Sequence, residues 1–440
     1  MPSLIFNGVH IYYEEKGSGE PLIFLHGLGM NMLAHRHEIE GLAAAFHVIA
    51  MDLRGHGRSD KPLSYTLQDH IDDVIAFMDY LQIKKANLLG CSMGSYIAQG
   101  VAIAVPERIE KLILVAAKSN GKTSSTARLL AEHADETAGL DLQGKIQFLS
   151  KYMFHQLDRV GVWMNDFHQA APSLTEEQQA AANIALEGFD FRSELNRITA
   201  RTLVIGGSYD GLNPPEEGKI IASLIPSAVF VAFNQSGHAP NIEEPERFIE
   251  TVNTFLNTSS PMDVVKLIDI YRERLTHCSP EQLSYRSGNK AWSLGQMYDH
   301  VIEVSKEYLV NAEACMNSGT MQPQGKTEAG EILFSLGGFP PVKIKLPDEF
   351  DSPAMLRKED LIDGLNRIKE LVIEWQGKVE AADPCSKVKH DGFGWLNAKE
   401  WLELVEMHFR HHLRQQADLE RQAGITPAHI SSSSLHSSIN

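Results

Sequence analysis

The stretch Leu88-Leu89-Gly90-Cys91-Ser92-Met93-Gly94 decides the fold of the first part of this chain. An apolar run ends there in a Gly-x-Ser-x-Gly pattern, and an uncharged, helix-compatible stretch follows over residues 95–105. A Gly-x-Ser-x-Gly pattern presents a nucleophile when it forms a tight turn between a strand and a helix. Gly90 and Gly94 lack the Cβ atoms that would clash in so sharp a turn. We therefore expect Ser92 to be exposed at the end of a strand, where the N–H of Met93, at a helix N-terminus, favours developing negative charge.

Length and composition limit the organisation and the partners of the chain. At 440 residues it exceeds what one hydrophobic core usually serves, so we expect two or three domains. A formal net charge of −17 argues against nucleic acid or an anionic membrane as a partner, because such binding needs a basic surface. Small soluble molecules are the expected substrates, and the oligomeric state is left open.

Cysteine usage and the N-terminal residues bear on the compartment. The four cysteines are scattered without matched spacing, which favours reduced thiols in a cytosol over a disulfide framework. The first residues contain neither a basic region nor a long apolar run, so they predict a strand and no signal peptide. The longest uncharged stretch, 88–105, contains the Gly-Ser turn and fits a buried strand and helix better than a membrane span. We expect a cytoplasmic protein.

The first half of the chain alternates between apolar runs and amphipathic stretches. Such β/α alternation builds a mostly parallel sheet covered on both faces. A polar, helical stretch at about 118–199 interrupts it and would lie above the strand ends as a lid. A hairpin-type turn is expected at 16–20. The expected strands are 4–15, 21–25, 46–51, the apolar run that ends at the Gly90–Gly94 turn, 111–116, 201–205 and 229–233, and the expected flanking helices are 37–45, 67–81, 95–105 and 245–256.

Four segments, taken together and in order, resemble the α/β-hydrolase superfamily over residues 1–258. They are His26-Gly27-Leu28-Gly29, Asp52-Leu53-Arg54-Gly55-His56-Gly57-Arg58-Ser59, the Gly90–Gly94 turn, and Ser236-Gly237-His238-Ala239-Pro240. The resemblance implies the α/β-hydrolase fold, a mostly parallel sheet with a helical lid. Ser92 at the turn excludes the haloalkane dehalogenases and epoxide hydrolases that resemble this fold, because those enzymes carry Asp at this position.

A serine hydroxyl needs a base to take its proton, and the base needs an orienting carboxylate. In α/β-hydrolases these residues follow in the order Ser, acid, His. His238 follows the last expected strand and is the predicted base, and Asp210 follows the strand before it and is the predicted acid. The Gly-rich loop after an early strand places the N–H of Leu28 as a second oxyanion donor beside that of Met93. No cofactor is expected for this domain.

Several other residues are weaker candidates for the same roles. Asp52 follows a strand but precedes the turn in sequence, and the resemblance makes its loop structural. Glu243 and Glu244 lie too close to His238 in sequence to be the expected acid. Cys91 is adjacent to the apex of the turn and would project differently. Five further histidines are expected to be hydrogen-bonded or solvated without a catalytic role: His26, His56, His133, His155 and His168.

After a short linker at 259–261 the alternation ends and long helical patterns take over. Ser293-Leu294-Gly295-Gln296 and Asn397-Ala398-Lys399-Glu400 are capping boxes that open two of the helices. Four helices are expected, at 262–276, 293–316, 359–381 and 397–423, and they predict an all-α four-helix bundle domain over 262–424. The Ser-rich tail at 425–440 has too little apolar content to fold and is expected to be flexible.

Three histidines are candidate metal ligands in this bundle. His408 and His412 are four residues apart, so they share one helix face, and His300 lies on another helix. Three imidazoles leave open positions on a divalent metal, as catalytic sites do. His411 lies about 100° away around the helix and should point elsewhere. The alternative is a surface histidine cluster with His300 as a satisfied core residue.

Two segments make this half similar to the DinB-like family of metal-binding bundles: the residues from Trp292 to His300, and Met407-His408-Phe409-Arg410-His411-His412. The resemblance implies that His300, His408 and His412 hold a divalent metal such as Zn, Ni, Mn or Fe. Members of that family include thiol S-transferases in which the metal activates a small thiol.

The sequence therefore predicts a serine hydrolase fused to a DinB-like bundle. The expected substrate is an ester, lactone or thioester of a small molecule, and C–C bond hydrolysis is a further reaction open to such a triad. One alternative places the main activity in the bundle, as a metal-dependent thiol S-transferase or metal-binding protein with the hydrolase module auxiliary. Another is a non-enzymatic ligand receptor built on a hydrolase scaffold.

Overall fold

The computed structural model describes residues 3–6, 8–171, 173–258, 263–286, 291–317, 321–339 and 356–425. The chain divides into two compact units, Met1–Leu256 and Asn257–Asn440, which are described separately below. The predicted linker at 259–261 lies outside the described residues, as does the predicted tail from 426 onward. Within the described part of the chain, no helix combines the length and the apolar run needed to cross a bilayer.

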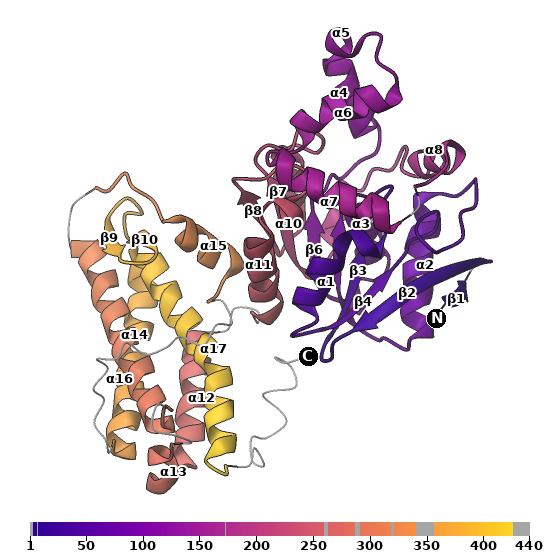
Figure 1. The fold of residues 1–440 in the computed structure, drawn as a ribbon. Coiled ribbons are helices and arrows are strands. Elements are labelled where there is room, and N and C mark those ends of the chain that lie inside the picture. Colours follow the sequence, from indigo (N-terminus) through magenta and orange to yellow (C-terminus); the bar gives the residue numbers. More distant parts are fainter. Residues whose placement is uncertain are drawn as a thin grey trace. The chain divides into compact units, whose positions relative to one another are not determined.

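The first unit is built on an eight-stranded sheet (Figure 1). Its strands lie in the order β1-β2-β4-β3-β5-β6-β7-β8, antiparallel between β1, β2 and β4 and parallel between all the others. The sheet is therefore mostly parallel, as predicted. The strands are β1 (Ser3–Phe6), β2 (Val9–Lys16), β3 (Pro21–Leu25), β4 (His47–Met51), β5 (Ala86–Cys91), β6 (Ile109–Val115), β7 (Arg201–Gly207) and β8 (Ala228–Phe233).

Two expectations about the N-terminal residues are wrong. The single strand expected at 4–15 is a pair, because the chain reverses at Gly8, which has a φ of +77°, and β1 then pairs antiparallel with β2. The turn at 16–20 is not a hairpin, because β4 lies between β2 and β3. An alternating pattern marks a strand but does not name its neighbour.

Helices cover both faces of the sheet. Leu112 and Leu114 belong to the core beneath α2, α3 and α9, whereas Ile113 between them faces the opposite layer. On that opposite side α1 and α11 lie next to each other, since Gly41 leaves room for the Ile249 side chain. The covering helices are α1 (Arg36–Leu42), α2 (Leu67–Tyr80), α3 (Met93–Ala104), α9 (Pro215–Leu224) and α11 (Pro245–Asn257), with the short α10 (Pro240–Glu243) before the last.

A helical insertion separates β6 from β7 at the place of the proposed lid. It contains α4 (Ser125–Glu132), α5 (Ala134–Thr137), α6 (Leu142–Met153), α7 (Leu157–Ala170) and α8 (Glu176–Ile184). Figure 1 shows these helices gathered beyond one end of the strands. Helix α7 packs against α10, which follows β8, so the insertion contacts the same end of the sheet as the loop that precedes α10.

The second unit is a helical bundle, as predicted. Its four long helices pack against one another in the cyclic order α12, α16, α14 and α17, and α16 also contacts α17 across the bundle. They are α12 (Val264–Thr276), α14 (Leu294–Asn317), α16 (Lys358–Val379) and α17 (Ala398–Gln422), and both predicted capping boxes are formed. The bundle also contains α13 (Pro280–Ser284), α15 (Glu328–Leu336) and an antiparallel hairpin of β9 (Lys387–His390) and β10 (Gly394–Asn397), whose strands are too short for a periodic signal.

Candidate active site and candidate metal centre

The turn after β5 holds Ser92 in a strained conformation. Its φ and ψ are 48° and −114°, a region that a residue with a side chain rarely adopts. A Cβ at Gly90 would collide with the Gly94 carbonyl, and a Cβ at Gly94 with the Leu25 carbonyl, so both glycines are sterically required. The Ser92 N–H donates to the Val115 carbonyl at 2.8 Å, which fixes the turn to β6.

The three residues of the predicted triad lie within hydrogen-bonding distance. His238 Nε2 is 3.0 Å from Ser92 Oγ, and His238 Nδ1 is 2.8 Å from Asp210 Oδ2. A carboxylate only accepts hydrogen bonds, so Nδ1 carries the proton and Nε2 is free to accept the proton of Ser92. The Asp210 side chain is fully buried and that of His238 is 11% exposed. The arrangement is that of a nucleophile, a base and an orienting acid.

The second oxygen of Asp210 is also occupied. Its Oδ1 accepts the N–H groups of Leu212 and Asn213, both at 2.9 Å. These bonds hold the acid loop in place after β7. The loop therefore presents the Asp210 side chain to the imidazole of His238 in a fixed orientation.

The two predicted oxyanion donors flank Ser92. Met93 is the first residue of the twelve-residue helix α3, where backbone N–H groups have no partner within the helix. The loop that carries Leu28 runs alongside, since a Cβ at Gly27 would lie 3.6 Å from the Cβ of Ser92. A substrate carbonyl bound at Ser92 would thus lie between two chain segments that can each supply a backbone N–H.

The competing side chains serve other purposes. Asp52 is 2% exposed and accepts the N–H groups of Met32 and Arg58, so it holds its loop together, while burial raises the pKa of its carboxyl. Cys91 is buried, and burial raises the pKa of its thiol well above the usual value. A thiol without thiolate character is a poor nucleophile. Within the described residues, neither side chain forms a hydrogen bond with Ser92 or His238.

One buried carboxylate has a role that the sequence reasoning missed. Glu243, 1% exposed, receives four backbone N–H groups. Its Oε1 accepts from Gly237 and Ala239 at 2.9 and 3.2 Å, and its Oε2 accepts from His155 and Gln156 at 2.7 and 2.8 Å. The first pair flanks His238 and the second joins α6 to α7. Glu243 therefore ties the loop of the base to the helical insertion.

Two histidines that were expected to be hydrogen-bonded, His26 and His56, are buried and hydrogen-bonded. His26 is fully buried, accepts the Leu53 N–H on Nε2 at 2.9 Å and donates from Nδ1 to the Gly27 carbonyl at 2.8 Å. Burial lowers the pKa of His56 to about 4 and that of His70 to about 3, so both are neutral near pH 7. These side chains support the loops after β3 and β4.

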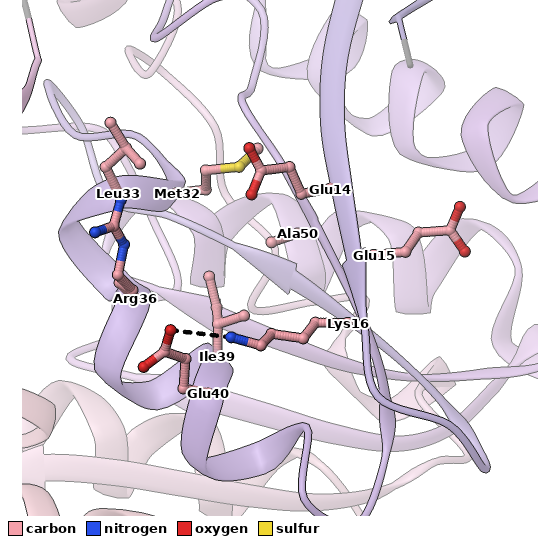
Figure 2. Close-up of a pocket in the computed structure, with 9 residues that line it drawn as sticks. All are labelled: Glu14, Glu15, Lys16, Met32, Leu33, Arg36, Ile39, Glu40 and Ala50. Carbon is pink, nitrogen blue, oxygen red and sulfur yellow. Dashed lines mark hydrogen bonds and ion pairs between the residues drawn. The ribbon is translucent and has the colours of Figure 1, made fainter. Parts of the chain in front are cut away.

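A hollow of about 110 Å³ lies away from these residues, on the outside of the first unit between β2 and α1 (Figure 2). Lys16 and Glu40 form an ion pair across it at 2.9 Å. Both side chains are exposed, and pairs of this kind contribute little to stability. The hollow contains none of the predicted site residues.

The bundle brings its three predicted histidines together. Nε2 of His408 lies 3.2 Å from Nε2 of His300 and 3.1 Å from Nε2 of His412. His408 and His412 are buried and His300 is half-buried, so this is not a surface cluster. The ligand atoms of all three lie within 4.8 Å of one another, close enough to share one metal ion. His411 is not part of this group. Its ring packs against that of Phe339, with 5.5 Å between the ring centroids.

The surroundings keep these imidazoles neutral. Burial, together with a smaller effect of neighbouring imidazoles, lowers the pKa of His300 to about 4 and that of His412 to about 3. Burial also lowers the pKa of His408 well below its usual value. Gln415 Oε1 lies 2.7 Å from His412 Nδ1, so this nitrogen carries the proton and Nε2 presents its lone pair. A neutral imidazole is the form that binds a metal.

Comparisons with known proteins agree with this architecture. A family model described as alpha/beta hydrolase fold matches residues 20–245, and one described as DinB superfamily matches residues 265–416. The AB hydrolase superfamily protein YisY of Bacillus subtilis is 31% identical over 57% of this chain and 96% of its own length. The pimeloyl-[acyl-carrier protein] methyl ester esterase of Aliivibrio fischeri is 28% identical over 56% of this chain and 97% of its own.

A solved structure supports the same assignment. The enol-lactonase from Burkholderia xenovorans LB400 aligns with a TM-score of 0.52 and 26% identity, covering 58% of this chain and 99% of its own. The fold, the turn geometry and these matches together support an enzyme and argue against a ligand receptor on an inactive scaffold. The chain belongs to the α/β-hydrolase fold family, with a DinB-superfamily domain following the hydrolase domain.

Proposed function

We propose that the chain is a serine hydrolase that cleaves an ester, lactone or thioester of a small molecule. The observation that carries the proposal is the hydrogen-bonded series Ser92, His238 and Asp210. Among the relatives, one is an esterase of a methyl ester and another an enol-lactonase, which favours acyl transfer to water over other chemistry. The net charge of −17 favours a small-molecule substrate over a nucleic acid or an anionic membrane.

In the proposed reaction Ser92 Oγ attacks the substrate carbonyl carbon, and its proton passes to His238 Nε2. The carbonyl oxygen takes the π electron pair and accepts hydrogen bonds from the N–H groups of Met93 and Leu28. Collapse of this intermediate expels the alcohol or thiol, which takes the proton from His238 and leaves an acyl-enzyme. Water then attacks the acyl carbon and gives a proton to His238, which returns it to Ser92 Oγ as the acid leaves.

The test is hydrolysis of p-nitrophenyl acetate together with labelling by a serine-directed fluorophosphonate. Ser92→Ala should abolish both, because no other group can form the acyl-enzyme. Ser223→Ala removes an exposed hydroxyl on α9 that bonds only its own helix, and it should behave as wild type. Full turnover by folded Ser92→Ala protein would refute the proposal.

We also propose that the bundle binds a divalent metal, Zn, Ni, Mn or Fe, through His300, His408 and His412. The three Nε2 atoms are close enough for one ion, and their imidazoles are neutral. Three nitrogen ligands without a carboxylate leave the ion net positive, so an open position would polarise a bound thiol or water. This supports the second candidate function, a metal-dependent thiol S-transferase with the hydrolase module auxiliary.

Elemental analysis of purified protein separates the two functions. Wild type should carry about one divalent metal per chain, and His408→Ala should lose it. His411→Ala is the matched control on the same helix and should retain the metal. A chain that contains no metal after purification and reconstitution, but hydrolyses esters, would leave the transferase without support.

A further inference from the structure

A buried asparagine outside the predicted triad uses both N–H groups and the oxygen of its side chain. Asn213 lies three positions after Asp210 in the loop between β7 and α9, and it is 3% exposed. Its Nδ2 lies 2.7 Å from the Ala116 carbonyl oxygen and 2.7 Å from the Tyr96 hydroxyl oxygen, and its Oδ1 lies 2.7 Å from Ser125 Oγ. A buried amide that is bonded on all sides in this way is rigid.

The Ala116 carbonyl fixes which way this amide faces. A carbonyl oxygen only accepts hydrogen bonds, so the NH₂ group must face Ala116 and the amide oxygen must face the hydroxyl of Ser125 on α4. The second N–H of the amide then donates to the Tyr96 oxygen. The main-chain N–H of Asn213 is used as well, because it donates to Asp210 Oδ1 at 2.9 Å. One residue therefore joins the acid to three other segments of the domain.

Two of these segments are the ones that hold the nucleophile. Ala116 directly follows Val115, whose carbonyl accepts the N–H of Ser92 at 2.8 Å. Tyr96 is the fourth residue of α3, the helix that begins immediately after Ser92. Ala116 has a φ of +49°, a backbone conformation that persists in an alanine only when its surroundings hold it. The hydrogen bonds of Asn213 therefore connect the acid loop to the two segments that support Ser92.

The separation of Asp210 and Ser92 matters because a single imidazole has to bridge it. His238 Nδ1 is 2.8 Å from Asp210 Oδ2, its Nε2 is 3.0 Å from Ser92 Oγ, and the ring between these nitrogens is rigid. Asp210 follows β7 and Ser92 follows β5, with β6 between these two strands. A shift of the acid loop away from the end of β6 would lengthen one of the two hydrogen bonds, and a misplacement of about 1 Å can cost about 100-fold in rate.

We propose that Asn213 is a positioning residue of the triad. Its side chain holds the acid loop to the end of β6 and to the first turn of α3, and thereby sets the distance between Asp210 and Ser92 that His238 bridges. The inference rests on the proposed serine-hydrolase function. Asn213 acts through Asp210 and takes no part in proton transfer or in substrate binding. Its loss should therefore slow the chemical steps and leave the affinity for substrate unchanged.

Asn213→Leu tests the proposal, because leucine has nearly the same shape as asparagine but forms no side-chain hydrogen bond. With p-nitrophenyl acetate we expect kcat to fall by about 10- to 100-fold at an unchanged KM. Asn87→Leu is the matched control and should keep the kcat of the wild type. Asn87 is also buried, 2% exposed, but it lies at the beginning of β5, at the far end of that strand from Ser92. Wild-type kcat in folded Asn213→Leu protein would overturn the proposal.

The same substitution in an Asp210→Ala background separates positioning of the acid from a general loss of stability. The readout is the rate of labelling by a serine-directed fluorophosphonate, which can be followed even when turnover is slow. A residue that acts only through Asp210 has no further effect once that carboxylate is gone, so Asp210→Ala should be labelled equally fast with and without Asn213→Leu. An equal fold-loss from Asn213→Leu in both backgrounds would overturn the proposal. Absence of labelling in the wild type would instead refute the serine-hydrolase function itself.

Asn213→Ala covers the case in which the leucine variant does not fold. It leaves a space that water can enter, so the three former partners of the amide can stay hydrogen-bonded. We expect the same loss of kcat at an unchanged KM, because a water molecule is not covalently attached to the acid loop and cannot hold it to the end of β6. Folded Asn213→Ala protein with the kcat of the wild type would overturn the proposal.

Discussion

Oγ of Ser92 lies 3.0 Å from Nε2 of His238, although the two residues are 146 positions apart. Ser92 stands at the end of β5 and His238 follows β8, and three parallel ladders of the sheet separate these strands. Parallel strands deliver the loops at their carboxyl ends to the same edge, which is where α/β proteins bind ligands. The hydrogen bond between these two side chains therefore depends on the register of four strands.

Replacement of Asp210 by Asn should remove most of the activity without unfolding the protein. The amide would donate to Nδ1 of His238 and turn the imidazole into the tautomer that cannot accept the Ser92 proton. In the serine-protease template such a change costs ~10⁴ in kcat. Steady-state hydrolysis of p-nitrophenyl acetate measures the effect, and circular dichroism verifies the fold. Activity within tenfold of the wild type would contradict the assigned role of this acid.

Glu243→Gln should weaken the tie between the base loop and the helical insertion. The amide nitrogen cannot accept two of the four N–H groups that Glu243 now receives. Leaving buried donors without a partner costs ~1–3 kcal/mol of the free energy of unfolding. Urea unfolding measures this loss, and Glu246→Gln on the exposed first turn of α11 is the control. Equal stability of the two variants would show that the four hydrogen bonds of Glu243 do not contribute to the free energy of unfolding.

Breaking the buried ion pair of Arg54 and Asp73 should strongly lower the free energy of unfolding of the first unit. The guanidinium donates to both carboxylate oxygens at 2.7 and 2.8 Å, and both side chains are buried. Removing one partner leaves a buried charge, so Asp73→Ala should cost ~3–5 kcal/mol. Asp72→Ala, at the exposed neighbouring position, should cost much less. Calorimetric midpoints of the two variants that coincide would argue against this account.

Metal removal should affect the bundle and spare ester hydrolysis. A ligand that binds only the folded state adds about 4 kcal/mol of stability when its free concentration is about 1,000 times Kd. We expect a chelator to lower the unfolding temperature of the bundle and zinc or nickel to restore it, while turnover of p-nitrophenyl acetate is unchanged. Ester hydrolysis should be unchanged because none of the three predicted metal ligands, His300, His408 and His412, belongs to the triad. Loss of ester hydrolysis with the metal would show that the two domains are coupled.

Much of the fold was predictable because the signals are local. The Gly90–Gly94 turn, the β/α alternation and the capping boxes at Ser293 and Asn397 each depend on residues a few positions apart, and the structure forms all of them. The neighbour of β2 was not predictable, since an alternating strand carries no mark of the partner with which it pairs. The role of Glu243 was not predictable for a related reason: the sequence gives no sign of its four hydrogen bonds from backbone N–H groups, two of which come from an insertion almost 90 residues away.

The sequence by itself determined the identity of the candidate groups: a serine in a turn that only glycines permit, a histidine and an acid in the order of the family, and two histidines one helical turn apart. Local steric constraints and helical periodicity depend only on residues that are close together in the sequence. Only the tertiary structure decided that Ser92 meets His238 at 3.0 Å, and that His300 meets His408 at 3.2 Å. These contacts join residues on different elements, so they exist only once hydrophobic packing has set strand register and helix rotation.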